Sequence, residues 1–461
     1  MLSRGHIRLV AREETEGERR SHKDRSLRST LSVPDGVAII VGMVLGAGIF
    51  KTPSLVAAQC QSDAGVLLLW LAGGAISLVG ALCYAELASA YPHPEGDYHY
   101  LERAFGDAPA FLFAWSRVAV IQAGLVAMHA FLIGDYASEV VRLGPYSSSV
   151  YAIGAIVLLT LFNIMGVTRG KWIRIVLAPA IGLGLISVVG FGLAASPDGP
   201  LAAAAVDAGG ARGMGLALIF VLLTYGGWNE IAHFSSEVRQ ARRNMTGVLL
   251  CGVGAVTAIY LAFNYSLLRS LGLAAAASTG AVAADAMRAV PGGAGVASMS
   301  VLVACVALGS MNAVIIRGSR TNYAFGRAFP LFGFPGRSDR AANPRGLLLQ
   351  GAAALSLVLI GTAARGGFSM MVEYTAPACW LFFLLVGISL FVLRKKERAI
   401  ARPFRVPLYP VTPLIFCSIC LWMLYSSIVY TGWGGLMGVV VLLAGIPLFL
   451  IKRSCVAQDG V

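Results

Sequence analysis

Long apolar segments separated by short polar stretches run through almost the whole sequence. Each segment is close to the ~17–25 residues that a helix needs to cross the hydrocarbon core of a bilayer. We therefore expect an all-α polytopic membrane protein with twelve transmembrane helices, spans 1 to 12. The spans are predicted at residues 36–58, 64–85, 108–134, 147–168, 175–196, 213–236, 246–268, 296–316, 346–364, 374–393, 408–430 and 435–451.

Composition and charge agree with this pattern. Of the 461 residues, 57% are hydrophobic and 13% are charged, and the mean hydropathy is +0.74, which excludes a soluble globular domain. The net charge of +13 is unevenly placed: with loops assigned alternately to two sides, 29 Lys and Arg fall on the side of the N-terminus and 5 on the other. The positive-inside rule then predicts cytoplasmic N- and C-termini in a plasma or inner membrane. We expect a lipid bilayer partner and no nucleic-acid partner.

Span 1 contains residues that weaken a helix near its middle, namely Gly46, Gly48 and Pro53. In hydrocarbon an unpaired backbone group costs several kcal/mol, so a broken helix persists only where protein or a polar cavity covers it. Its freed N–H groups can bind a carboxylate, and its freed carbonyl groups can bind a cation. An α-amino acid carries both groups.

Span 6 has a similar interruption at residues 224–230, with the sequence Thr-Tyr-Gly-Gly-Trp-Asn-Glu. Each glycine alone is explained by close helix packing. Two interruptions five spans apart instead favour an inverted repeat of five helices with paired broken helices at the membrane midplane.

Five motifs follow one another between about residues 34 and 430. They are Gly42-x-x-x-Gly46-Ala47-Gly48-Ile49-Phe50-x-x-Pro53; Cys83-Tyr84-Ala85-Glu86-Leu87 with Gly96-Asp97-Tyr98; Tyr225-Gly226-Gly227-Trp228-Asn229; Gly309-Ser310-Met311-Asn312; and Arg402-Pro403-Phe404-Arg405-Val406-Pro407. Together they resemble the amino acid–polyamine–organocation (APC) superfamily of permeases, near its L-type amino acid transporter branch.

The resemblance implies the leucine-transporter (LeuT) fold, in which two inverted five-helix repeats are followed by two peripheral helices. The corresponding boundaries are a disordered cytoplasmic tail at 1–33, the first repeat at 34–200, the second at 201–398, spans 11 and 12 at 399–453, and a cytoplasmic C-terminus at 454–461.

The resemblance also implies a substrate site at the two interruptions. The amides of Ala47, Gly48 and Ile49 would hold a carboxylate, and carbonyls near Val44 and in span 6 would hold an ammonium group. The positive end of the outer half of span 1 suits an anion, and small residues permit close approach. The predicted substrate-binding residues are Val44, Gly46, Ala47, Gly48, Ile49, Leu223, Thr224, Tyr225, Gly226, Trp228 and Asn229.

The coupling ion is left open by a departure from the family pattern. Many sodium-independent members carry a lysine in span 5, and Ile181 stands at that position here. Either a cation or another side chain fills its place. Ser310 and Arg317, seven residues apart in span 8, are coupling or gating candidates, although the Arg317 side chain could instead reach the cytoplasmic surface.

Three further charges lie in or beside spans, where charges are costly and often functional. Lys51 either extends to the outer surface or belongs to an outer gate. For Glu86, a structural or gating ion pair is favoured over proton transfer. Glu230 is a candidate for proton coupling, with pairing to a basic residue as the alternative.

The sequence predicts a secondary transporter for small neutral α-amino acids that works by alternating access, as an exchanger or with a coupled proton or sodium ion. The alternatives are a polyamine or amine transporter and an amino-acid sensor without flux. We expect no enzyme, because no HExxH, GxSxG or GxxxxGK[ST] motif occurs. We expect no cofactor and no metal. The segment just before span 4 contains no cysteine, so no disulfide-linked heavy chain is implied.

Overall fold

The computed structural model describes residues 32–93, 95–166, 171–194, 210–231, 238, 240–288, 293–328 and 344–458, and every regular element in these ranges is a helix. The first elements are α2 (Val33–Val44), the 3₁₀ helix η1 (Ala47–Phe50), α3 (Thr52–Ala57), α4 (Asp63–Ala90), α5 (Asp97–Phe105), α6 (Asp107–Ser116), the π-helix η2 (Arg117–Gln122), α7 (Ala123–Val140), α8 (Ser147–Ile164) and α9 (Lys171–Ala194).

The remaining elements follow after residue 209. They are α10 (Gly210–Thr224), α11 (Trp228–Ile231), α12 (Ala241–Leu271), α13 (Leu273–Ser278), α14 (Val282–Ala286), α15 (Ala294–Ala328), α16 (Pro344–Ala363), α17 (Gly367–Lys396), α18 (Val411–Val429), α19 (Trp433–Leu443) and α20 (Gly445–Gln458).

Within the described residues, nine helical stretches are long and apolar enough to cross a membrane. They coincide with predicted spans 2, 3, 4 and 7–12. Three shorter apolar helices, Val33–Val44, Pro179–Ala194 and Arg212–Thr224, lie in predicted spans 1, 5 and 6. The protein is therefore an integral, multi-pass membrane protein, and two of the three short helices are those that the sequence predicts to be interrupted.

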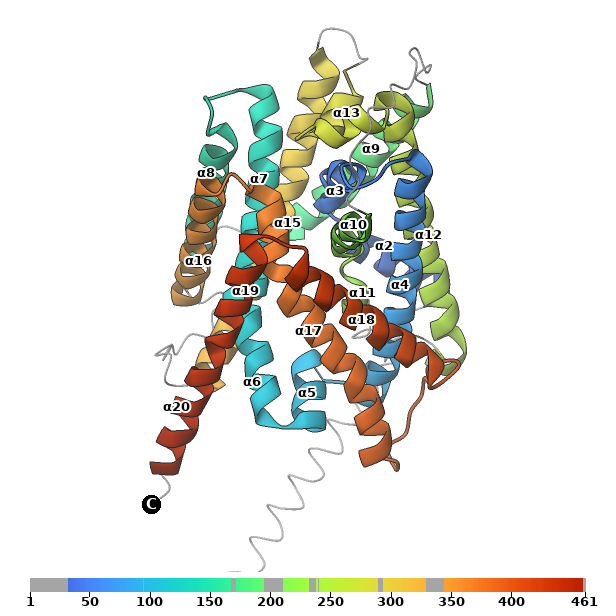
Figure 1. Cartoon of the computed structure of the whole chain (residues 1–461), viewed down its shortest axis with the longest axis vertical. Helices are drawn as coiled ribbons and strands as arrows, with labels where there is room; N and C mark the ends of the chain where they lie inside the picture. Colours follow the sequence, from blue (N-terminus) through green and yellow to red (C-terminus); the bar gives the residue numbers. More distant parts are fainter. Residues whose placement is uncertain are drawn as a thin grey trace, which may run out of the picture.

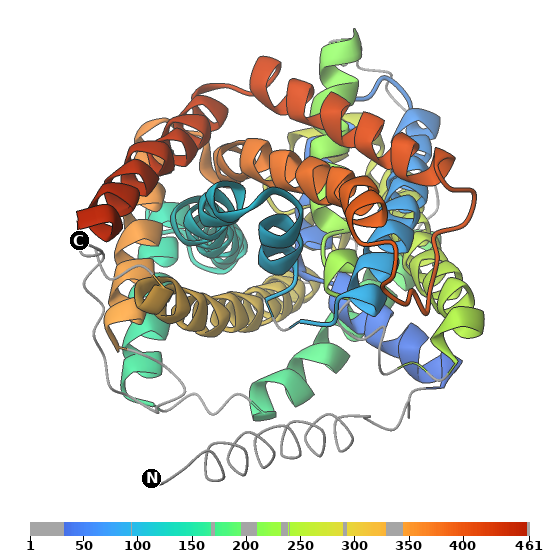
Figure 2. The same cartoon turned by 90° about the horizontal axis from the view of Figure 1, so that it is seen from below.

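The helices form one bundle around the interrupted elements (Figure 1). α10 and α11 lie in the middle of the view, with α2 and α3 beside them and α4 and α12 on one flank. α7 packs against α8, α15 and α17 on the other side. Seen from below, α18, α19 and α20 run along the outer edge of the bundle (Figure 2). The short broken helices are thus enclosed by long continuous ones.

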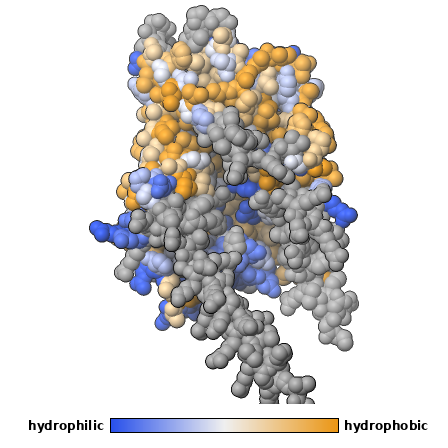
Figure 3. All heavy atoms as spheres, turned by 180° about the vertical axis from the view of Figure 1, so that it is seen from behind, coloured by the Kyte–Doolittle hydropathy of each residue, from blue (hydrophilic) through white to orange (hydrophobic). Residues whose placement is uncertain are grey.

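The surface separates into an apolar and a polar part (Figure 3). Hydrophobic side chains cover most of the upper part of this face, and hydrophilic ones gather towards its lower end. Many large hydrophobic residues are exposed, among them Leu158, Leu161 and Phe162 on α8. An apolar surface of this extent requires a lipid environment.

Candidate functional site

The first interruption lies between α2 and η1. α2 begins at a capping box in which the Ser32 side chain accepts a bond from the Asp35 amide and Asp35 accepts one from the Ser32 amide. It ends at Val44, and Gly46 is extended with φ −121° and ψ 178°. η1 then starts at Ala47 without a side-chain cap. The first amides of η1 therefore have no partner within their own helix and point to a potential anion site.

The second interruption lies between α10 and α11. α10 ends at Thr224, and the Gly226 amide donates to the Leu223 carbonyl in a tight turn (3.0 Å). Gly227 has φ +109°, which favours glycine, and α11 begins at Trp228. Both interruptions therefore occur at the predicted residues.

The two interruptions contact each other. A Cβ atom on Gly227 would lie 2.7 Å from the Met43 carbonyl oxygen, so only glycine allows this approach. Gly48 faces Thr224, where a Cβ atom would make ordinary contacts of 3.7–3.9 Å. The hydroxyl groups of Thr224 and Thr52 are hydrogen-bonded at 2.7 Å. The structure thus brings the predicted residues of spans 1 and 6 together.

Tyr260 on α12 joins the two interruptions and was not found by sequence reasoning. Its hydroxyl oxygen lies 3.0 Å from the Val44 carbonyl oxygen and 3.1 Å from that of Thr224. These are the last residues of α2 and α10, whose carbonyl groups lack partners within their helices. An aromatic residue in an apolar span carries no signal that would have revealed this contact.

Two of the predicted aromatic residues hold the second interruption in place. The Tyr225 hydroxyl donates to the Trp70 carbonyl on α4 (2.9 Å). Trp228 is buried among Tyr84, Phe383 and Phe416, with ring centroids 5.2–5.9 Å away.

Asn229 is half-buried. The Glu230 side chain lies outside the described part of the chain, so its role stays a prediction.

Lys51 is buried above the first interruption, with only 8% of its surface exposed. Its ammonium group donates to Asp135 Oδ2 on α7 and to the Gly280 carbonyl, both at 2.6 Å. Ser148 Oγ donates to the other oxygen of Asp135 at 2.7 Å. The side chain is thus tied to its neighbours instead of extending along the surface.

A second contact lies beside this ion pair. The Tyr136 hydroxyl on α7 donates to the Phe50 carbonyl at 2.5 Å and accepts a bond from the Ala283 amide at 3.3 Å. Lys51 and Tyr136 together connect η1, α7 and the segment 279–286, and this group of contacts is called the outer latch below.

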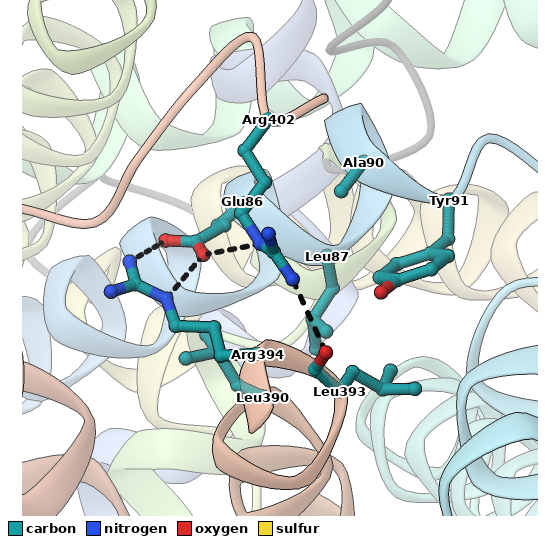
Figure 4. A pocket seen from close by; sticks show the side chains of 8 residues that line it. All are labelled: Glu86, Leu87, Ala90, Tyr91, Leu390, Leu393, Arg394 and Arg402. Carbon is teal, nitrogen blue, oxygen red and sulfur yellow. Dashed lines mark hydrogen bonds and ion pairs between the residues drawn. The ribbon is translucent and has the colours of Figure 1, made fainter. Parts of the chain in front are cut away.

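Glu86 forms a second buried ion pair, at the end of α4 and 2% exposed. Its carboxylate lies between the guanidinium groups of Arg394 and Arg402 (Figure 4). Arg394 donates Nε and Nη2 to it at 2.6 and 2.5 Å, and the Val406 amide donates at 2.6 Å. Arg394 also stacks on Tyr409, 3.7 Å from the ring centroid. We call these contacts the inner latch.

Among the described contacts, none joins the coupling candidates Ile181, Ser310 and Arg317 to one another. Ile181 and Ser310 are half-buried and Arg317 is exposed, on α9 and α15. Two residues after Ser310, Asn312 accepts a hydrogen bond from Asn163 on α8 (2.7 Å). The side chains of residues 171–178 lie outside the described part of the chain. The roles of these candidates stay predictions.

Comparisons with known proteins agree with the membrane architecture. The sequence model of the amino acid permease family matches residues 31–446. The chain is 26% identical to b(0,+)-type amino acid transporter 1 of Homo sapiens over 450 residues, which cover 93% of this chain and 89% of that protein.

Two further relatives are named as other types of amino acid transporter or exchanger. The chain is 24% identical to the serine/threonine exchanger SteT of Bacillus subtilis over 432 residues, which cover 93% of this chain and 97% of SteT. It is 26% identical to Asc-type amino acid transporter 1 of Homo sapiens over 454 residues, which cover 94% and 84%.

Proposed function

The chain belongs to the amino acid permease family, and we propose that it moves small neutral α-amino acids across the membrane by alternating access, by exchange or with a coupled cation. Its family and its relatives are membrane transporters, not enzymes. The similarity to amino acid transporters, which include a serine/threonine exchanger, supports the substrate class.

The proposal includes the LeuT fold with twelve spans, repeats at 34–200 and 201–398, two peripheral spans at 399–453, and both termini in the cytoplasm. Two interrupted helices, in the predicted spans 1 and 6, support the repeat because the first helix of each proposed half is interrupted. The excess of Lys and Arg on one side supports the orientation.

The proposed site depends on one observation: the N-terminal end of η1 and the C-terminal ends of α2 and α10 lie close together. The first amides of η1 form a partial positive end, and the last carbonyls of α2 and α10 form partial negative ends. Gly48 lies against Thr224, so both kinds of group are within the reach of one small molecule. We assign the carboxylate of the substrate to the amides of Ala47–Ile49 and its ammonium group to the carbonyl side.

The two latches are the proposed gates. The outer latch fixes η1 against α7, and the inner latch fixes α4 against α17 and the segment before α18. A substrate held at the interruptions can leave in either direction only when the elements on that side separate. In this assignment Lys51 and Glu86 are gating residues. The flux experiment tests a proton or a sodium ion as the coupling ion by imposing a gradient of each.

The function is tested by flux into liposomes that contain the purified protein. Labelled neutral, basic and acidic amino acids and a polyamine are supplied, with and without internal amino acid and with imposed proton or sodium gradients. We expect saturable uptake of at least one small neutral amino acid. The absence of binding and flux for every α-amino acid would refute the proposal, and flux of the polyamine alone would favour the amine alternative.

The site is tested by Gly48→Val, which adds an isopropyl side chain facing Thr224 at the first interruption. We expect loss of substrate binding with normal expression. Gly190→Val is the matched control, since Gly190 is exposed on α9 with nothing within 4 Å of a Cβ atom. Equal binding by both variants would contradict the placement of the site.

A further inference from the structure

The last carbonyl groups of two interrupted helices meet at a single side chain. Tyr260 Oη lies 3.0 Å from the Val44 oxygen and 3.1 Å from the Thr224 oxygen. The phenol has one proton, so it donates to one of these carbonyls at a time. Three oxygen atoms therefore lie together around one hydrogen atom, and each carbonyl retains a lone pair for a further donor.

The electrostatics of this position favour a cation. The C-terminal end of a helix carries about half a negative charge, and α2 and α10 both end here. Val44, Thr224 and Tyr260 are all buried, so water does not screen these ends. A group with several N–H donors and a positive charge suits the three oxygens better than the single phenolic proton does.

Tyr260 is held firmly in its position. Its ring packs edge-on against Trp70 and Tyr225, with centroids 5.3 and 5.0 Å away, and the side chain is 0% exposed. Tyr225 is itself bonded to the Trp70 carbonyl. Because the ring cannot turn away without disrupting this aromatic packing, its oxygen remains beside the two carbonyls when a substrate binds.

We infer that Tyr260 is a specificity-determining residue whose oxygen is the third acceptor for the ammonium group, beside the Val44 and Thr224 carbonyls. The inference rests on the proposed function. A primary α-ammonium group has three N–H donors and satisfies all three oxygens, whereas an N-methylated amino acid has two and leaves one oxygen without its bond. The protein therefore selects primary α-amino acids over their N-methyl forms.

The experiment compares the two substrate forms in the same protein. The best substrate of the flux panel and its N-methyl form are measured by competition, with L-alanine and N-methyl-L-alanine as the first pair. We expect the wild-type protein to prefer the primary amine by at least ten-fold. In Tyr260→Phe this preference falls about ten-fold, which corresponds to ~1.4 kcal/mol. The ratio cancels any change that affects both ligands equally, such as a less stable protein.

Tyr265→Phe is the matched control, because Tyr265 lies on the same helix and is exposed on its outer face. We expect it to keep the wild-type preference. An unchanged ratio in Tyr260→Phe overturns the inference, and so does an equal loss of affinity for both forms, which would mark a purely structural role. If Tyr260→Phe does not fold, the wild-type ratio decides: equal affinity for both forms overturns the inference. A wild-type protein without any α-amino acid flux contradicts the proposed function instead.

Discussion

We expect that removing the Asp135 carboxylate, one partner in the outer latch, allows the elements joined by the latch to separate. Lys51 Nζ lies 2.6 Å from Asp135 Oδ2, and the two side chains are 10% and 22% exposed. Breaking a buried ion pair from one side costs ~3–5 kcal/mol, because the other charge is left uncompensated. Ser148 and Gly280 remain as partners, so we expect the lower end of this range for Asp135→Asn. A cost of ~3 kcal/mol raises the open population about 100-fold.

The assay is the labelling rate of a cysteine placed under the latch. Ala283 is fully buried and its amide bonds to Tyr136, so Ala283→Cys reacts with a membrane-impermeant maleimide only after opening. All variants in this assay are made in a protein whose eight native cysteines have been replaced. We expect Asp135→Asn to raise the labelling rate of the cysteine in Ala283→Cys about 100-fold. The labelling rate of the cysteine in Ser278→Cys, an exposed control on α13, should stay unchanged.

A double-mutant cycle identifies the interaction. Lys51→Met with Asp135→Asn removes both charges, so the double variant should open less than the two single effects predict together. The reasoning is refuted if Asp135→Asn labels at the wild-type rate, or if the effects of the two substitutions simply add.

Three further predictions concern stability and are checked by thermal unfolding of the purified protein. Gly227→Ala should cost about 2–4 kcal/mol and abolish substrate binding, since φ is +109° and a Cβ atom would lie 2.7 Å from the Met43 oxygen; unchanged stability would contradict the close approach. Glu86→Gln should cost ~3–5 kcal/mol because two arginines lose their buried partner, and the loss should not recover at high salt. Burial, His93 and Arg103 lower the pKa of His99 on α5 below 6.5, so stability should fall as the pH drops below about 6.5, where the unfolded chain binds the proton more readily. His99→Gln should weaken this dependence, and an identical pH profile would count against it.

Much of the architecture follows from the sequence because it depends on local properties. The length and apolarity of the segments predict the nine helices of membrane-spanning length that the described residues contain, and the glycines at 46, 48, 226 and 227 predict where two helices stop. The family follows from short motifs and is confirmed. The count of twelve spans and the coupling ion stay predictions.

The sequence could not supply the partners of the functional residues. It left Lys51 between a surface position and a gate, and the structure places it against Asp135, 84 residues further along the chain. For Glu86 it favoured an ion pair without naming the partner, which is Arg394, 308 residues away. Such partners depend on how distant helices pack.

By itself the sequence determined that the chain crosses the membrane many times and that two of its helices are interrupted. These features follow from the cost of polar groups in lipid and from the backbone freedom of glycine, which act residue by residue. Only the tertiary structure decided what fills the space at the interruptions. Tyr260 lies 216 residues from Val44, and its hydroxyl is brought to two helix ends because buried carbonyl groups require a donor.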